Sequence, residues 1–153
     1  MSKSSVTVLE NNFGAIRKSV TGKQLERAAL AGGYVIEGYA KINVNQTFSS
    51  KSTGGAGLGG RIPTVISESS NTSAWTDTGP TVIYGRIQEL GGIIKPVFAK
   101  MLSWIGDDKK RIFAKMVTLP ARPYLRPAAD EHKPDILQAI GTQLKKQIEG
   151  AAG

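Results

Sequence analysis

The clearest pattern in the chain is the helical spacing of apolar residues between Leu25 and Ile42. This spacing predicts a helix over about 22–43. Thr21, followed three positions later by Gln24, has the pattern of a capping box at its start. Three glycines lie inside the predicted helix: Gly32, Gly33 and Gly38. Each costs up to about 1 kcal/mol against alanine, a cost more readily tolerated where another backbone approaches closely. We therefore expect this helix to pack tightly.

A second amphipathic pattern lies near the end of the chain. Its apolar positions are Ile136, Leu137, Ile140, Leu144 and Ile148. Lys145 and Lys146 lie near the C-terminal end of this predicted helix, where cations are favoured, and Gly150 follows them. Either Pro127 or Pro134 could open a helix at its first position. We expect Leu144 to be buried against the rest of the protein.

The region between these helices contains several β-prone runs. Val97–Trp104 and Arg111–Leu119 flank a Gly-Asp-Asp turn at 106–108 and predict a hairpin. Thr81–Ile83 is β-prone, whereas Tyr84–Leu90 has helical spacing, which favours a strand running into a short helix. Strands and helices mix without βαβ alternation. The predicted class is therefore α+β, with a mainly antiparallel sheet of about four strands packed by a long N-terminal helix and a C-terminal helix.

Residues 45–79 differ from the rest of the chain. They are rich in Ser, Thr, Gly and Asn, and a connection of this length is usually functional or mobile. We expect an extended loop or β-arm that does not pack on its own chain and reaches a neighbouring subunit. Its apolar residues are the expected anchors: Ile62, Val65, Ile66 and Trp75. With this segment included, the length of 153 residues predicts a single domain over 1–153.

Charge adds a possible partner chemistry. The formal net charge is +8, and residues 95–133 carry nine basic and four acidic groups. Such a basic stretch can bind a phosphate backbone or an acidic protein, or it can simply be a solvated face. The chain has no cysteine, which excludes disulfides, thiolate zinc sites and a cysteine nucleophile. No apolar run reaches the ~20 residues that span a bilayer, and the first residues do not have the pattern of a secretory signal.

Two candidate chemical motifs fail on their context. Residues 55–60 match G-x-G-x-x-G, and Asp77 follows at the spacing of a dinucleotide fingerprint. That fingerprint needs a strand before the glycines and a helix after them, and neither flank has such a pattern. His132 lies beside Asp130 and Glu131, but no nucleophile motif accompanies it, so a surface histidine in a first helical turn is expected. We therefore expect no enzymatic activity, no cofactor and no metal.

Two stretches resemble a known protein family. The first is Tyr84-Gly85-Arg86-Ile87-Gln88-Glu89-Leu90-Gly91-Gly92, followed by Ile94-Lys95-Pro96. The second runs from Phe113 to Leu125 and continues through Arg126-Pro127-Ala128 to the C-terminal helix. Both are similar to stretches in the virion-morphogenesis, or tail-completion, proteins of Mu-like tailed phages, which are related to the small tail-component proteins of lambda-like phages. The resemblance covers about residues 80–150, and residues 45–79 depart from it.

The resemblance implies a structural protein of a tailed-phage virion at the head–tail junction (neck, tail completion or tail terminator). Such a protein would form a homo-oligomeric ring and contact neighbouring head-completion or connector proteins and tail-tube proteins. It would be made in the cytoplasm of the bacterial host and end in the virion, with no membrane partner. The alternative is a small basic nucleic-acid-binding module.

Within the second stretch, Arg122 and Arg126 are the cations of greatest interest, and Tyr124 between them is a further interface candidate. Prolines on either side stiffen the backbone, so the two guanidinium groups are presented at low entropic cost. They could pair with a partner's carboxylates or face DNA in a central channel. Alternatively, one of them caps carbonyls or pairs with Glu89 inside the fold.

Overall fold

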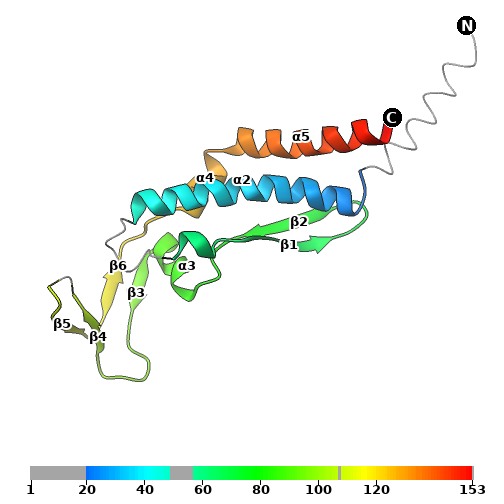
Figure 1. Cartoon of the computed structure of the whole chain (residues 1–153). Coiled ribbons are helices and arrows are strands. Elements are labelled where there is room, and N and C mark those ends of the chain that lie inside the picture. Colours follow the sequence, from blue (N-terminus) through cyan, green and yellow to red (C-terminus); the bar gives the residue numbers. More distant parts are fainter. Residues whose placement is uncertain (1–19, 49–56, 107, 153) are drawn as a thin grey trace, which may run out of the picture.

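The computed structural model describes residues 20–48, 57–106 and 108–152. Its central element is helix α2 (Lys23–Thr47), close to the helix predicted from the sequence. Helix α5 (Lys133–Ala152) runs antiparallel along one side of α2, and the β1–β2 hairpin lies along the other side (Figure 1). Gly22 (φ 54°), rather than Thr21, is the N-cap residue of α2. The α2 helix is thus enclosed between a helix and a hairpin.

Two adjacent glycines allow α2 to approach both neighbours. A Cβ on Gly32 would lie 2.8 Å from Cδ1 of Ile140 on α5. A Cβ on Gly33 would lie even closer to Cγ2 of Thr64 on the hairpin. Both distances are shorter than carbon atoms tolerate, so only glycine fits without movement of a neighbour. The tight packing expected for this helix is confirmed at these two positions, whereas Gly38 faces open space.

The hairpin consists of β1 (Thr64–Ser69) and β2 (Ala74–Thr78), paired antiparallel with a register shift between Ile66 and Glu68. Thr64 anchors it, because its hydroxyl donates a hydrogen bond of 3.0 Å to the carbonyl oxygen of Gly33. The hairpin therefore packs on α2 of its own chain. The expectation that residues 45–79 form an arm free of their own chain is wrong for the described part of that segment, and residues 49–56 lie outside the described residues.

The buried core lies at the C-terminal end of α2. Its buried members are Ala40, Val44, Phe48, Leu58, Ile62, Tyr124 and Ala128. Leu58 and Ile62 come from the segment that the sequence marked as polar, and both are at most 1% exposed. A mostly polar connection can still dock when some of its apolar residues enter a core that other elements supply.

Two short helices connect the core to the rest of the molecule. Helix α3 (Ile83–Leu90) begins directly after Val82. The Val82 backbone is extended, but the β-prone Thr81–Ile83 forms no strand, and the helical spacing that begins at Tyr84 determines the structure here. Helix α4 (Leu125–Asp130) precedes α5. Pro127 is the third residue of α4 and Pro134 the second of α5, so neither proline occupies the first helical position.

The remaining strands form an arm that projects from the helical body (Figure 1). At its base, β3 (Gly92–Ile94) pairs with β6 (Val117–Leu119). Further out, β4 (Leu102–Ile105) pairs with β5 (Arg111–Ala114), which confirms the predicted hairpin. We call residues 92–119 the projecting arm.

The α+β class, the two long helices and the antiparallel pairing are confirmed. In the described residues the strands form three separate two-stranded sheets, where the sequence analysis expected one sheet of about four strands. The Val97–Trp104 run is a strand only in its last part, because β4 begins at Leu102. Residues 95–101 instead form a loop between β3 and β4.

Helix α5 is held to α2 by a polar cluster as well as by apolar contact. The Tyr39 ring stacks on the His132 ring with centroids 3.3 Å apart. The Tyr39 hydroxyl donates a 2.8 Å hydrogen bond to Asp135 Oδ2, and His132 Nδ1 lies 3.4 Å from the same oxygen. His132 is therefore half-buried at the start of α5 rather than a free surface residue. Leu144, expected to be buried, is only half-buried.

Candidate protein-interaction surface

The two stretches that carry the family resemblance meet in the structure, where Glu89 of the first stretch contacts the second. The Glu89 carboxylate accepts hydrogen bonds from the backbone N–H groups of Tyr124 (2.7 Å), Leu125 (2.9 Å) and Arg126 (2.9 Å). These donors lie at the N-terminal end of α4, where N–H groups have no partner within the helix. A negative charge is also favoured there by the helix dipole. Glu89 on α3 thus caps α4 from a remote position.

Tyr124 strengthens the same junction. It is fully buried, and its hydroxyl donates a 3.2 Å hydrogen bond to the carbonyl oxygen of Gly85. Burial, together with the nearby Glu89 charge, raises the pKa of Tyr124 to about 12. A buried side chain cannot contact a partner directly. The expectation that Tyr124 belongs to an interface is therefore wrong for the isolated chain, and its contribution is to the core.

The two arginines of interest are exposed and serve different surroundings. The Arg122 guanidinium carbon lies 5.8 Å from the centroid of the Phe48 ring, which is cation–π geometry at the end of α2. Its backbone N–H donates to the carbonyl oxygen of Gln88 at 2.8 Å. Arg126 lies at the edge of a groove described below. Arg126 does contact Glu89, as one of the alternatives expected, but through its backbone N–H.

The four predicted anchors of the 45–79 segment are divided by the fold. Ile62 is buried in the core, so it is wrong as a free anchor, whereas Ile66 is half-buried. Val65 and Trp75 are 51% and 64% exposed on the hairpin and are available to a partner. The sequence showed apolar residues here but could not show which of them face α2.

The projecting arm presents the most apolar surface to solvent. Its exposed large side chains are Ile93, Val97, Phe98, Met101, Trp104, Ile105, Ile112, Phe113 and Met116. Single exposed apolar residues are ordinary, but so many of them on one projection are typical of an interaction site. The sequence analysis predicted a hairpin here but did not identify this surface, because β-prone runs do not show what packs against them.

The arm is also basic. Over residues 92–119 the sequence has six basic and two acidic groups. Three of the basic residues are consecutive, Lys109, Lys110 and Arg111, at the turn of the β4–β5 hairpin. Lys110 lies 3.8 Å from Asp108, a highly exposed pair of little energetic weight. The arm therefore combines apolar contact area with unneutralised positive charge.

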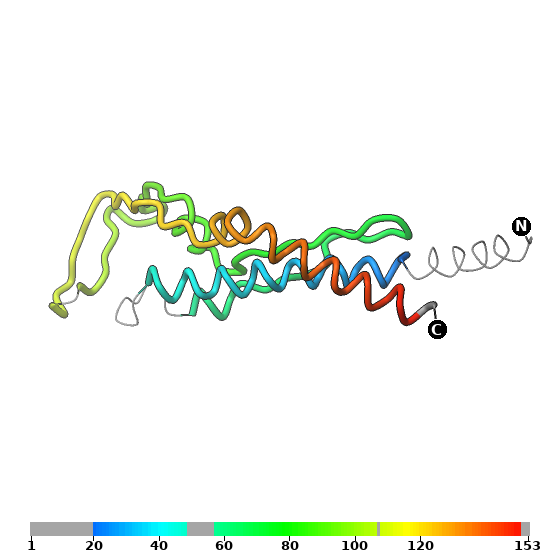
Figure 2. The backbone as a smooth tube through the Cα atoms, turned by 90° about the horizontal axis from the view of Figure 1, so that it is seen from above, coloured from blue at the N-terminus to red at the C-terminus, as the bar shows by residue number. Residues whose placement is uncertain are grey.

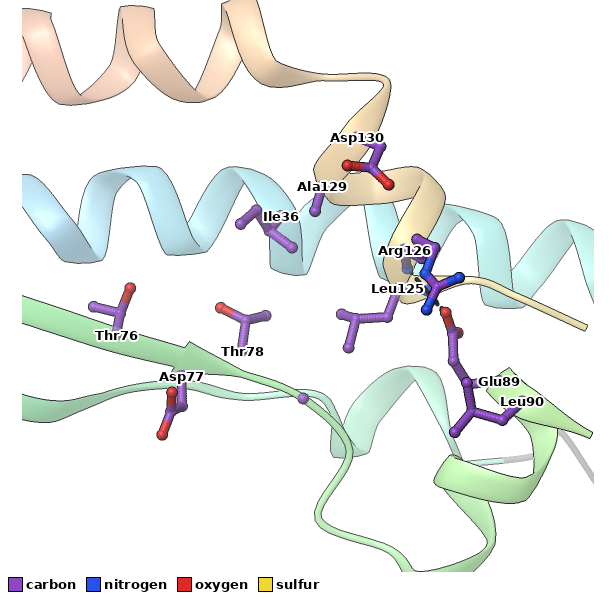
Figure 3. A pocket seen from close by; sticks show the side chains of 11 residues that line it. Ile36, Thr76, Asp77, Thr78, Glu89, Leu90, Leu125, Arg126, Ala129 and Asp130 are labelled. Carbon is purple, nitrogen blue, oxygen red and sulfur yellow. Dashed lines mark hydrogen bonds between the residues drawn. The ribbon is translucent and has the colours of Figure 1, made fainter.

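A groove of about 710 Å³ lies on the body, between α2, β2, α3 and α4. Figure 3 shows Ile36 and Leu125 pointing into it, with Asp130 at the α4 edge and Asp77 at the β2 edge. Its ionisable residues are three acids and one base: Asp77, Glu89, Asp130 and Arg126. The groove is thus apolar in the middle and negative in net charge, whereas the arm is apolar and positive in net charge.

In the part of the chain that the structure describes, no group of three or more His, Asp or Glu side chains could hold a metal ion. The glycines at 57–60 lead through a single 3₁₀ turn (Gly59–Arg61) into a strand, which does not fit a dinucleotide site. Among the described helices, none is both long and apolar enough to cross a bilayer.

Comparison with known proteins finds no matching family model, no matching curated protein and no matching solved structure. Inference about function therefore starts from the arm, the groove and the residues that hold them in place.

Proposed function

We propose that this chain is a non-enzymatic structural protein of a tailed-phage virion, and that it joins head and tail as a ring at their junction. The single observation that carries the proposal is the projecting arm, with Phe98 fully exposed and Val97 82% exposed. When a partner covers apolar surface of this kind, the free energy of the complex falls by about 25 cal/mol per Å² of surface removed from water. An arm that reaches beyond its own body is a natural way to contact the next subunit in a ring.

The resemblance to tail-completion proteins supports the phage assignment. Its two stretches are far apart in sequence, yet they are joined by the Glu89 hydrogen bonds and by the Tyr124–Gly85 contact. Residues that resemble a family pattern for architectural reasons are expected to meet in this way. These hydrogen bonds of Glu89 and Tyr124 hold the base of the arm against the body, and they therefore fix the direction in which the arm projects.

A phage that carries this gene provides the test. A conditional stop codon at Lys23 should leave filled heads and separate tails, and the chain supplied in trans should restore tailed particles. Electron microscopy of the lysate distinguishes the outcomes. Normal numbers of tailed, infectious particles without the protein would contradict the proposal.

The second candidate, a nucleic-acid-binding module, rests on Lys109, Lys110 and Arg111 at the tip of the arm. If these residues held phosphates, reversing their charge would flatten the salt dependence of DNA binding by about one slope unit per lost contact. We expect instead no specific DNA binding at physiological salt. Sequence-selective binding in a gel shift, lost in the charge-reversed variant, would favour the second candidate over the ring.

A further inference from the structure

We infer that the groove on the body receives the 95–101 loop of the projecting arm from a second copy of the chain. The inference deepens the proposed ring and rests on that function for its biological setting. It identifies the partner of both surfaces as the same chain and gives the contact a direction, from the arm of one subunit to the groove of the next.

We call the 95–101 loop the plug, because its centre is apolar and exposed and its two flanks are basic. At its centre, Val97 is 82% and Phe98 103% exposed, so neither side chain is covered by its own chain. Lys95 and Lys100 flank this apolar pair, one on each side, and Pro96 restricts the backbone beside it. A loop that is partly rigid before binding loses less conformational entropy when it docks.

The groove has the complementary chemistry. Its volume of about 710 Å³ lies within the ~300–1,000 Å³ of sites that take drug-sized ligands, so it has room for one valine and one phenylalanine side chain. Ile36 and Leu125 offer apolar contact in the middle (Figure 3). Asp130 at the α4 edge offers a carboxylate to a lysine of the loop (Figure 3), whereas the Asp77 side chain points away from α2, because its neighbours Thr76 and Thr78 face Gly33. The apolar pair and its two cations thus meet an apolar centre whose lining is negative in net charge.

The other charges near the groove do not cancel this match. The Glu89 carboxylate is already engaged by three backbone N–H groups. Lys133 lies 3.3 Å from Asp130, but both side chains are more than half exposed, so their pairing is weak and readily exchanged. Arg126 is the one cation lining the groove, and it leaves the net charge of the lining negative.

The loop lies on the arm, whereas the groove lies on the body near the base of the arm (Figure 1). In both Figure 1 and Figure 2 the arm extends away from the body, and the groove lies among α2, β2, α3 and α4. A loop directed away from the body does not fill the groove of its own chain. Contact between two different surfaces of the same chain is heterologous, and such contacts repeat around an axis to form a ring when the rotation closes.

The experiment compares the masses of full-length variants by size-exclusion chromatography with light scattering. Phe98→Asp damages the plug, and Asp130→Lys damages the groove. Leu137→Asp is the matched control, because Leu137 is also exposed (68%) but lies on α5, outside both surfaces. The wild-type and control chains should form the same oligomer, whereas the plug and groove variants should elute as 16.3 kDa monomers. Unchanged circular dichroism shows that each variant is folded.

Mixing the two damaged variants gives the decisive readout. The groove variant retains its plug and the plug variant retains its groove, so an equimolar mixture should form a dimer of two chains and stop there. A mixture that stays monomeric, a Phe98→Asp chain that assembles like the wild type, or a wild-type chain that remains monomeric would each overturn the inference.

The outcomes separate this inference from the proposed function. Oligomers that persist in Phe98→Asp would reject the contact between arm and groove and leave a ring built by another surface. A dimer in the mixture, together with tailed particles that form without the protein, would confirm the contact and reject the phage function.

Discussion

At the scale of single residues, Glu89 determines how the middle of the molecule is connected. Helix α4 has six residues and no side-chain cap of its own. The Glu89 carboxylate supplies that cap from α3 and accepts three backbone hydrogen bonds. Gly91, two residues later, has φ 69°, and a Cβ there would lie 2.7 Å from the backbone nitrogen of Ala121. A remote carboxylate and a close backbone approach together fasten α3 to the chain that enters α4.

Replacing Glu89 with alanine should lower the free energy of unfolding by about 2–3 kcal/mol, because hydrogen bonds to a charged group are lost and their donors are left without an acceptor. Glu89→Gln should lose less, since one acceptor oxygen remains. Urea denaturation measures both changes. Glu149→Ala is the control, because the exposed Glu149–Lys145 pair (3.7 Å) contributes little. Equal stability of the Glu89→Ala and Glu149→Ala variants would contradict the capping role.

Tyr124 predicts a stability change at alkaline pH. The pKa of its phenol is raised to about 12 in the folded chain from the ordinary tyrosine value of 10.0, so the folded state favours the neutral phenol. That stabilisation is complete below about pH 10 and is lost as the pH rises towards 12. Tyr124→Phe lacks the ionising group, and it should be less stable at pH 8 because Gly85 loses its hydrogen bond.

The measurement for Tyr124 is the difference in unfolding free energy between the wild-type and Tyr124→Phe chains. This difference should shrink as the pH rises from 10 to 11.5, whereas other titrating groups affect both chains alike. A difference that stays constant over this range would show that the phenol is not held neutral by the fold.

At the scale of elements, α2 owes its position to glycines on two of its faces. Gly32 allows α5 to pack closely, and Gly33 allows the hairpin to do so through Thr64. A helix with an alanine at each site would be intrinsically more helical but could not approach both neighbours. The loss of helix propensity at these glycines is therefore compensated by packing against residues more than thirty positions away in the sequence.

Gly33→Ala should destabilise the protein by about 1–3 kcal/mol, because the new methyl group overlaps Thr64 Cγ2 and forces the hairpin outward. Gly38→Ala, in the same helix, is the matched control, since no atom lies within 4 Å of its Cβ position. That control should be stabilised by up to about 1 kcal/mol through helix propensity alone. Thermal unfolding compares the two variants, and a stabilised Gly33→Ala chain would show that the close contact does not exist.

At the scale of the whole molecule, the body and the projecting arm differ in how they are stabilised. The buried cluster in the described residues draws its members from α2, α4 and the segment around Leu58 and Ile62. The arm contributes none of them, although it contains much of the exposed apolar surface. The body is thus stabilised by its buried cluster, whereas the arm leaves its apolar side chains exposed.

Shortening the arm should leave the body intact. Ile94 and Val117 are paired directly across β3 and β6, so residues 95–116 can be replaced by Asn-Gly, which favours a two-residue hairpin turn. The melting temperature should change by no more than a few degrees, because no core contact is removed. Self-association should be lost in the same variant. A shortened chain that unfolds would show that the arm supports the body.

Much of the secondary structure could be predicted from local pattern. The helical spacing of apolar residues marked α2 and α5, and the Gly-Asp-Asp turn between β-prone runs marked the β4–β5 hairpin. These features depend on residues a few positions apart, which interact in the same way in any chain context. The interface candidates were less predictable, because the exposure of Val65 or Tyr124 depends on what packs against it.

What the sequence alone determined is the α+β class, its two long helices and the excess of positive charge between 95 and 133. Only the tertiary structure decided that Leu58 and Ile62 enter the core, and that Phe98 remains outside it. Leu58 and Ile62 lie in a mostly polar segment, and Phe98 lies in a β-prone run whose pattern does not determine its burial. Their burial depends on contacts with α2, α4 and the core that are distant in sequence, and such contacts form only when the chain has folded.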